Sequence, residues 1–164
     1  MPSLVLLRHA KSAYPAGVAD HDRPLNGRGR RDAPVAGRMI ADLVRRVDIA
    51  LVSTATRAQQ TWAAAGQQLE VGRTESVPGL YLASADAMLR RIRALDADSV
   101  VVVAHNPGIE ILAERLARDT ESPNYRAMMA KFPTAAFALL TDDRPLSRWG
   151  YGAVDLLAFE VARG

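Results

Sequence analysis

The sequence predicts an α/β protein: a single three-layer αβα domain with a mostly parallel central sheet and helices on both faces. Two observations lead to this fold class. Apolar runs of strand length alternate along the chain with longer segments of helical periodicity. The runs are apolar at every position, which is typical of parallel strands buried on both faces. In such sheets ligands bind beyond the carboxyl ends of the strands, so we expect the functional residues there.

The first strand and the first helix are expected on either side of an irregular loop. Ser3 to Leu7 is an apolar run that stops at Arg8 and His9, where polar residues begin. A loop rich in Asp, Pro and Gly follows, and Asn26 is suited to cap a helix from about Arg28 to Arg46. The apolar residues of this helix recur every three or four positions and predict one buried stripe, formed by Val35, Met39, Ile40, Leu43, Val44 and Val47.

A second strand-to-helix switch follows directly. Ile49 to Val52 is expected to form a strand, residues 53–56 a polar corner, and Arg57 to about Leu69 a helix. The next segment has a weaker pattern, and we expect only one short strand in it, near Glu75 to Val77. The Pro-Gly pair at 78–79 then predicts a turn.

The third apolar strand is the clearest in the sequence. It covers residues 100–104 and ends at His105. Helical periodicity predicts a helix before it, from Ala85 to Leu95, and another after it, from Ile109 to Arg118. The stretch that follows is polar up to about position 133 and predicts no regular element, whereas residues 137–140 and 154–161 have the pattern of two final strands.

Length and composition narrow the class of protein. The 164 residues are about half apolar, which suits one core of ordinary size, and we expect one domain over residues 1–164. The chain has no cysteine, which excludes disulfides, thiolate nucleophiles and Cys-ligated zinc. No export signal is visible and no apolar run approaches the roughly 20 residues of a membrane span, so we expect a cytoplasmic protein. The net charge of +3, from 21 basic and 18 acidic side chains, is too balanced to indicate nucleic-acid binding.

Three predicted strands end beside residues that suit a phosphoryl group. Arg8 and His9 follow the first strand, Arg57 lies one turn beyond the second, and His105 follows the third. If these strands are neighbours, two guanidiniums and two imidazoles meet in a pocket suited to a dianion, with no carboxylate to repel it. A neutral imidazole is a competent nucleophile near pH 7, because its ordinary pKa is about 6.5. Such chemistry needs neither a metal ion nor another cofactor.

Five segments carry a family resemblance: LVLLRHAKS, DRPLNGRGRRDA, STATRAQQTW, GLYLASADAML and VVVVAHNPGIE. In this order they resemble the histidine phosphatase superfamily, which is phosphoglycerate mutase-like. Their spacing is similar to that of its short bacterial branch, the SixA-type phosphohistidine phosphatases. The resemblance covers nearly the whole chain. The usual R-H-G motif reads R-H-A here, with Ala10 in the third position, a substitution that fits this branch.

The resemblance implies roles for individual residues. His9 would be the nucleophile that is phosphorylated during turnover, and His105 the second catalytic histidine. The expected phosphate contacts are Arg8 and Arg57 and, as weaker candidates beside the motif positions, Asn106 and Ser12.

The resemblance also implies an acidic residue between the middle arginine and the late histidine, which protonates the leaving group. The segment GLYLASADAM, which corresponds to that region, has no Glu. Asp86, Glu75 and Asp22 are weak candidates, so the general acid stays unassigned. An alkoxide depends on that proton, whereas imidazole and phenol, with pKa values of about 6.5 and 10, leave with less help. We therefore expect phosphohistidine or aryl phosphates to be preferred over sugar phosphates.

Other functions fit the same residues less well. The chain has no insertion long enough for a lid, which favours a shallow pocket open to a phosphorylated protein and argues against a mutase, which must enclose its intermediate. A broad small-molecule phosphomonoesterase and a non-catalytic phosphoryl-binding module stay open as alternatives. The expected partner is a phosphorylated protein or small molecule, and neither nucleic acid nor a membrane.

The remaining polar clusters receive structural interpretations. His21 lies between two Asp residues in a loop, where we expect it to be solvated and not catalytic. No metal site is expected there, because adjacent residues rarely converge on one ion. Tyr81 is a candidate for a wall of the pocket. Four basic residues near the first helix are interpreted as a solvated surface: Arg23, Arg28, Arg30 and Arg31.

Overall fold

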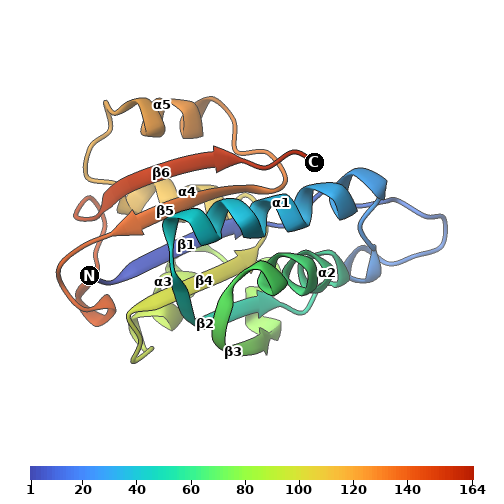
Figure 1. The fold of residues 1–164 in the computed structure, drawn as a ribbon, viewed down its shortest axis with the longest axis horizontal. Helices are drawn as coiled ribbons and strands as arrows, with labels where there is room; N and C mark the ends of the chain where they lie inside the picture. The colour runs from blue at the N-terminus through green and yellow to red at the C-terminus, as the bar shows by residue number, and fades with distance from the viewer.

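The computed structural model describes residues 1–164, and one sheet of six strands forms its centre (Figure 1). The strands are β1 (Ser3–Arg8), β2 (Arg46–Ser53), β3 (Glu70–Val77), β4 (Ser99–Ala104), β5 (Ala136–Thr141) and β6 (Asp155–Val161). They lie in the order β3-β2-β4-β1-β5-β6. Strands β1 to β4 pair in parallel with one another, whereas β5 is antiparallel to β1 and to β6. The predicted mostly parallel sheet is confirmed.

Helices cover both faces of this sheet. They are α1 (Gly27–Leu43), α2 (Thr56–Ala65), α3 (Ala85–Arg93), α4 (Gly108–Leu116) and α5 (Pro123–Ala130). α1 and α2 lie on the face that is turned to the viewer in Figure 1 and pack on Val5 and Leu7 of β1. α3, α4 and Met128 of α5 belong to the core on the opposite face, with Leu4 and Leu6. The three-layer αβα architecture is therefore also confirmed.

Strand β4 shows why the central strands are apolar at every position. Val100 and Val102 contact the core beneath α3 and α4, whereas Val101 and Val103 contact the core beneath α1 and α2. All four side chains are fully buried. Because successive side chains of a strand point to opposite faces, a strand covered on both sides has no position that faces water.

The sequence-based prediction for the first helix is wrong in its end and only partly right in its buried face, since Ile40 is buried and Val35, Met39 and Val44 pack partly buried against the core. α1 ends at Leu43, whose side chain is 46% exposed instead of buried, and Val44 is already extended. A Cβ on Gly37 would lie 2.2 Å from the carbonyl oxygen of Ala65, so α1 and α2 pack at a distance that only small residues permit. Large apolar side chains are therefore a poor guide to this face, which consists of Gly29, Asp32, Ala33, Ala36, Gly37 and Ile40.

Other boundaries differ from the predictions for identifiable reasons. β3 begins at Glu70, well before the predicted start, because it is a half-exposed edge strand without an apolar pattern. α5 was not predicted, because this short helix buries only Met128 and so has no clear apolar periodicity, although Ser122 caps it and Pro123 starts it. α2, α3 and α4 each end a few residues before their predicted ends. The cap of α1 is as predicted: Asn26 Oδ1 accepts a hydrogen bond from the Gly29 N–H at 2.9 Å.

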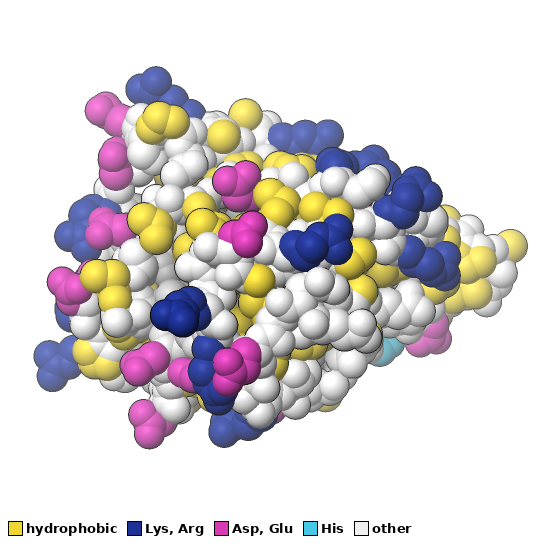
Figure 2. Space-filling view, in the orientation of Figure 1, with side chains coloured by type: hydrophobic (Ala, Val, Ile, Leu, Met, Phe, Trp, Pro, Cys, Tyr) yellow, Lys and Arg dark blue, Asp and Glu magenta, His cyan; other side chains and the backbone are white.

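Three of the four residues of the basic cluster near the first helix are solvated, as the sequence predicted. Arg28, Arg30 and Arg31 are exposed, and Figure 2 shows basic side chains gathered over α1 with acidic ones interspersed on the rest of that face. None of the helices combines the length and the apolar character that a membrane span needs.

Candidate active site

The carboxyl ends of β1, β2 and β4 lie side by side at one edge of the sheet. β1 and β4 are paired up to the last residue of each, and β2 pairs with β4 to within one residue of the end of each. His9 follows β1, His105 follows β4, and Arg57 is in the first turn of α2, just beyond β2. The structure thus brings these three side chains together, as the strand-end pattern predicted.

His9 is buried and held in one orientation. Only 7% of the residue is exposed. Its Nδ1 lies 2.7 Å from the carbonyl oxygen of Ala10, and since a carbonyl only accepts hydrogen bonds, the imidazole proton is on Nδ1. The electron pair of the neutral ring is then on Nε2, which accepts a long hydrogen bond of 3.4 Å from Arg57 Nε.

His105 stands next to His9. The centroids of the two rings are 5.1 Å apart. His105 Nε2 lies 2.7 Å from the hydroxyl oxygen of Ser53, which ends β2, and the ring of Tyr81 packs edge-on against His105 at 5.6 Å. Tyr81 is therefore a wall of the site, in agreement with the sequence-based expectation.

Both imidazoles are neutral at physiological pH. Burial lowers the pKa of His9 to about 3 and the pKa of His105 to about 4. Loss of hydration is the main cause in each case, because it disfavours the charged ring, and the positive charge of Arg57 acts in the same direction. A neutral His9 with its electron pair on Nε2 is the form that can act as a nucleophile.

Unused hydrogen-bonding capacity is concentrated at this edge. The buried side-chain atoms without a partner are Arg8 Nε, His105 Nδ1 and Asn106 Oδ1. Such atoms are rare in folded proteins and call for an explanation, for which a catalytic role is one candidate. Arg8 is anchored by a hydrogen bond from Nη1 to the carbonyl of Phe132 at 2.9 Å. Asn106 donates to the same carbonyl and to Glu110, so its amide offers no free donor to a phosphoryl oxygen.

A carboxylate also belongs to the site, so the prediction of a pocket without one is wrong. Arg57 Nη1 donates to the main-chain oxygen of Asp20 at 2.7 Å, and Nη2 donates to its carboxylate at 3.2 Å. The hydroxyl of Tyr81 and the guanidinium of Arg23 donate to the same carboxylate. These hydrogen bonds, above all that of Tyr81, hold the pKa of Asp20 below its usual range and keep it ionised.

Ser12 is buried close to this cluster and contacts it through Arg23. The Ser12 hydroxyl oxygen accepts a hydrogen bond of 2.6 Å from Arg23 Nη1. Only 12% of the Arg23 side chain is exposed, so the interpretation of Arg23 as part of a solvated surface is wrong. His21 is likewise not simply solvated, because its Nε2 lies 2.9 Å from the Thr54 hydroxyl and its ring packs against Tyr81.

Sequence reasoning missed Asp20 because its contacts join the loop to Arg57 and Tyr81, and it missed Arg23 because its contacts form only within the folded loop. The available signal was the loop itself: residues 10–26 form a long connection directly after the strand that positions His9, and such loops commonly carry functional side chains.

The candidate general acids lie apart from the two histidines. Asp86 lines a cavity that begins at His105, but its carboxylate is bound by the Tyr151 hydroxyl. Glu75, on β3, pairs with Arg73. Asp22 is exposed and pairs with His21. None of the three carboxylates forms a hydrogen bond or ion pair with His9, Arg57 or His105, and no group of three or more His, Asp and Glu side chains is arranged to hold a metal ion.

Buried neutral imidazoles flanked by guanidiniums, at the carboxyl edge of a parallel sheet, define a phosphoryl-handling α/β protein. The family model described as the histidine phosphatase superfamily (branch 1) matches residues 4–81. An uncharacterised protein of Mycobacterium tuberculosis (strain ATCC 25618 / H37Rv) is 38% identical over 164 residues, which cover 96% of this chain and 100% of the relative. The chain belongs to the histidine phosphatase superfamily.

Solved structures place it near one group within that superfamily. The structure of a protein proposed to be the phosphohistidine phosphatase SixA of Nakamurella multipartitia superposes with a TM-score of 0.82 at 32% identity, over 98% of this chain and 96% of that one. A second protein proposed to be SixA, from Agrobacterium tumefaciens, gives a TM-score of 0.81 at 33% identity, over 98% and 97% of the two chains. The resemblance to the SixA-like branch is thereby confirmed.

Proposed function

We propose that this chain is a metal-independent phosphatase in which His9 is phosphorylated during turnover. The observation that carries the proposal is the state of His9, whose proton is held on Nδ1 by the Ala10 carbonyl while the electron pair is on Nε2. Nε2 attacks phosphorus while His9 keeps its proton on Nδ1, and the bond from phosphorus to the leaving group breaks. The leaving group takes the bonding electrons, as a phenolate from an aryl phosphate or as neutral imidazole from a phosphohistidine protonated on its other ring nitrogen. Water then attacks phospho-His9, the phosphorus–nitrogen electrons return to Nε2, the water proton passes to solvent, and inorganic phosphate leaves.

The groups around His9 are suited to stabilise the transferring phosphoryl group. Arg57 is in direct contact with His9, and Arg8 has a buried Nε without a partner. Two guanidiniums offset the charge that develops on the equatorial oxygens, and the neutral ring of His105 can donate one further hydrogen bond. Every catalytic group proposed here belongs to the protein chain itself, so the proposal includes no metal ion and no cofactor.

The proposed substrates are phosphohistidine and other phosphoryl donors whose leaving group needs little protonation. Asp20 is the carboxylate closest to the chemistry by its contacts, and its hydrogen bonds keep it ionised, so it has no proton to give. A phosphohistidine ring that is protonated on its other nitrogen leaves as neutral imidazole, whose conjugate acid has a pKa of about 6.5, and it therefore needs less help from a carboxylic acid than an alkoxide does. The SixA-like relatives support the same substrate class.

We also propose a domain organisation, a cellular compartment and a partner for this activity. We propose that residues 1–164 act as one domain in the cytoplasm, since a chain without cysteine suits a reducing compartment. The proposed partner is a phosphorylated protein.

The test is turnover of a phosphohistidine peptide, an aryl phosphate and a sugar phosphate in the presence of a metal chelator. We expect the first two substrates to be preferred and His9→Ala to abolish turnover of all three. His21→Ala removes a nearby histidine that does not contact His9, and we expect it to stay within about tenfold of the unmutated protein. A preference for the sugar phosphate would indicate an unassigned acid and a broad phosphomonoesterase. Binding of phosphate without any turnover would indicate a phosphoryl-binding module.

A further inference from the structure

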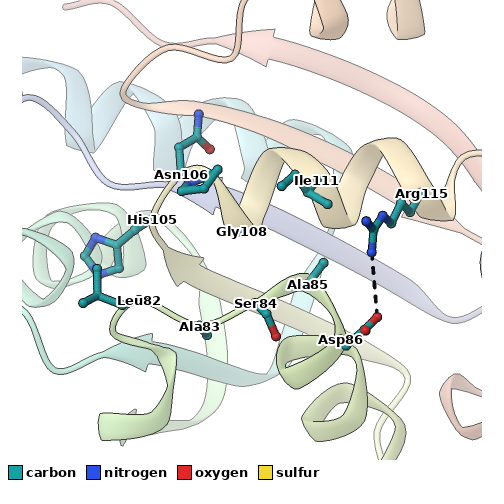
Figure 3. A pocket seen from close by; sticks show the side chains of 11 residues that line it. Leu82, Ala83, Ser84, Ala85, Asp86, His105, Asn106, Gly108, Ile111 and Arg115 are labelled. Atoms are coloured by element: carbon teal, nitrogen blue, oxygen red, sulfur yellow. Dashed lines mark ion pairs between the residues drawn. The ribbon is translucent and has the colours of Figure 1, made fainter.

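A groove leads away from the phosphoryl site along α4. It has a volume of about 330 Å³ and is bounded by residues 82–86 on one side and by the first two turns of α4 on the other (Figure 3). His105 stands at one end of it, and the ion pair between Asp86 and Arg115 stands at the other. His9, Arg8 and Arg57 do not line it. The groove is therefore continuous with the phosphoryl site through His105 but distinct from it.

The surface of the groove is mostly apolar, and the polar side chains between its two ends are Ser84 and Asn106. Its walls carry Leu82, Ala83 and Ala85 on one side and Ile111 on the other. The charges at the far end cancel, because the carboxylate of Asp86 faces the guanidinium of Arg115 at 4.0 Å. A ligand rich in hydroxyl groups would find few partners on these walls beyond Ser84 and Asn106, whereas an aliphatic side chain would bury apolar surface there.

The walls are held in place by the main chain. A Cβ on Gly108, at the start of α4, would lie 2.3 Å from the carbonyl oxygen of Ala83 and 2.4 Å from the end of the buried Met88 side chain. The 82–86 segment is thus pressed against α4, and the groove exists before any ligand binds.

The wall at Leu82 requires an unfavourable main-chain conformation. Its φ is +60°, a left-handed conformation that is unfavourable for a leucine, and its side chain is 76% exposed beside His105. Strained residues of this kind persist when the surrounding structure over-determines them, and they are concentrated at ligand-binding sites. An exposed apolar side chain in a strained conformation next to a catalytic histidine is suited to contact a substrate.

We propose that the groove binds the polypeptide next to a phosphorylated histidine, with an apolar side chain of the substrate between Leu82 and Ile111. This inference rests on the proposed phosphohistidine phosphatase function and names its substrate in more detail. Pockets for small ligands cover roughly 70–90% of the ligand surface. This groove is open along its length, since Leu82, Asp86 and Arg115 are all exposed, so a chain can lie in it and continue at both ends.

The experiment compares two substrates with the same leaving group. One is phosphoimidazole, which is too small to reach the groove, and the other is a phosphohistidine peptide with leucine on each side of the phosphohistidine. The readout is kcat/KM for the peptide divided by kcat/KM for phosphoimidazole. Leu82→Gly removes the side chain at a position whose φ suits glycine, so folding is not at risk, and Ile111→Ala tests the opposite wall. Leu43→Gly is the matched control, because this leucine is exposed at the opposite ends of the strands.

We expect both groove variants to lower this ratio about tenfold and Leu43→Gly to leave it unchanged. A ratio that is the same in all three variants overturns the groove assignment and leaves the phosphatase proposal intact. The same variants are also assayed on an aryl phosphate, and a loss confined to that substrate assigns the groove to small molecules and likewise overturns the proposal. If the unmutated protein hydrolyses neither substrate, both proposals fail.

Discussion

Two regions of the molecule meet at Arg57: the ends of the central strands, which carry His9 and His105, and the loop that carries Asp20. Different interactions hold each region in place. The ends of β1 and β4 position His9 and His105 by main-chain pairing within a sheet that is buried on both faces. The loop at residues 10–26 positions Asp20 through side-chain hydrogen bonds near the surface. We infer that the strand ends determine whether phosphoryl transfer occurs, whereas the loop affects how strongly Arg57 binds an anion.

Arg57, which touches both regions, should give the largest effect. We expect Arg57→Ala to lower kcat/KM on a phosphohistidine peptide about 1,000-fold, the order of loss typical of an arginine that stabilises a transferring phosphoryl group. Arg57→Lys should restore only part of this activity, because an ammonium cannot contact His9 and the phosphoryl oxygens with one planar group. Steady-state kinetics measures both variants, and a loss below about tenfold in Arg57→Ala would contradict its role.

The two buried histidines at the strand ends also predict how the free energy of unfolding depends on pH. The pKa is about 3 for His9 and about 4 for His105 in the folded protein, and about 6.5 for both in the unfolded chain. Below about pH 6.5 the unfolded chain therefore binds protons that the folded protein does not, and the free energy of unfolding decreases as the pH falls. We expect a loss of about 2 kcal/mol for each histidine between pH 7 and pH 5.

Urea denaturation at these two pH values measures the loss. His9→Asn serves as the control, since a variant with one buried histidine fewer should lose about half as much stability over the same range. Equal free energies of unfolding at both pH values in the unmutated protein would show that the histidines are not buried in the neutral form.

The junction between the two regions can be tested with a pair of glycines in the first turn of α1. A Cβ on Gly29 would lie 2.1 Å from the carbonyl oxygen of Lys11, close to His9 in the chain, so the main chain there would have to move. We expect Gly29→Ala to lower the free energy of unfolding by about 1–3 kcal/mol. Gly27→Ala meets only the end of the Arg31 side chain, at 3.4 Å, and should be neutral or stabilising by up to about 1 kcal/mol. Thermal or urea unfolding compares them, and equal effects would refute the close approach.

A substitution in the loop at residues 10–26 should have the smallest effect. Asp20 donates no proton and competes with an incoming dianion for Arg57. Its side chain is 54% exposed, so the interaction is screened by water, and we expect Asp20→Asn to tighten inhibition by inorganic phosphate only about two- to fivefold. Asp22→Asn is the control, because Asp22 contacts only His21. Weaker inhibition in Asp20→Asn would mean that Asp20 positions Arg57 instead of competing for it.

The same comparison explains how much the sequence could predict. The central strands were predictable because burial on both faces leaves no polar position in runs such as 100–104. The carboxyl ends of parallel strands lie at one edge of the sheet, and the order β2-β4-β1 in the structure makes the three ends neighbours, so that His9, Arg57 and His105 meet. Local patterns therefore predict the fold class and the candidate residues, whereas the strand order brings these residues together.

Contacts between distant segments could not be predicted in this way. No local pattern relates Asp20 to Arg57, since this pair forms only when the loop folds against α2, or Ser12 to Arg23, since this pair forms only when the loop folds on itself. The buried face of α1 was partly missed for a related reason: Gly37 is selected by the closeness of Ala65 in another helix, and not by its own hydrophobicity.

The central claim is that His9 itself carries the phosphoryl group. The most direct test mixes the protein with a radiolabelled aryl phosphate, stops the reaction with alkali, in which phosphohistidine is stable, and locates the label by digestion and mass spectrometry. We expect a label on His9, none in His9→Ala, and an unchanged label in Asp22→Asn. Label on His105 or His21, or steady turnover in His9→Ala, would contradict it.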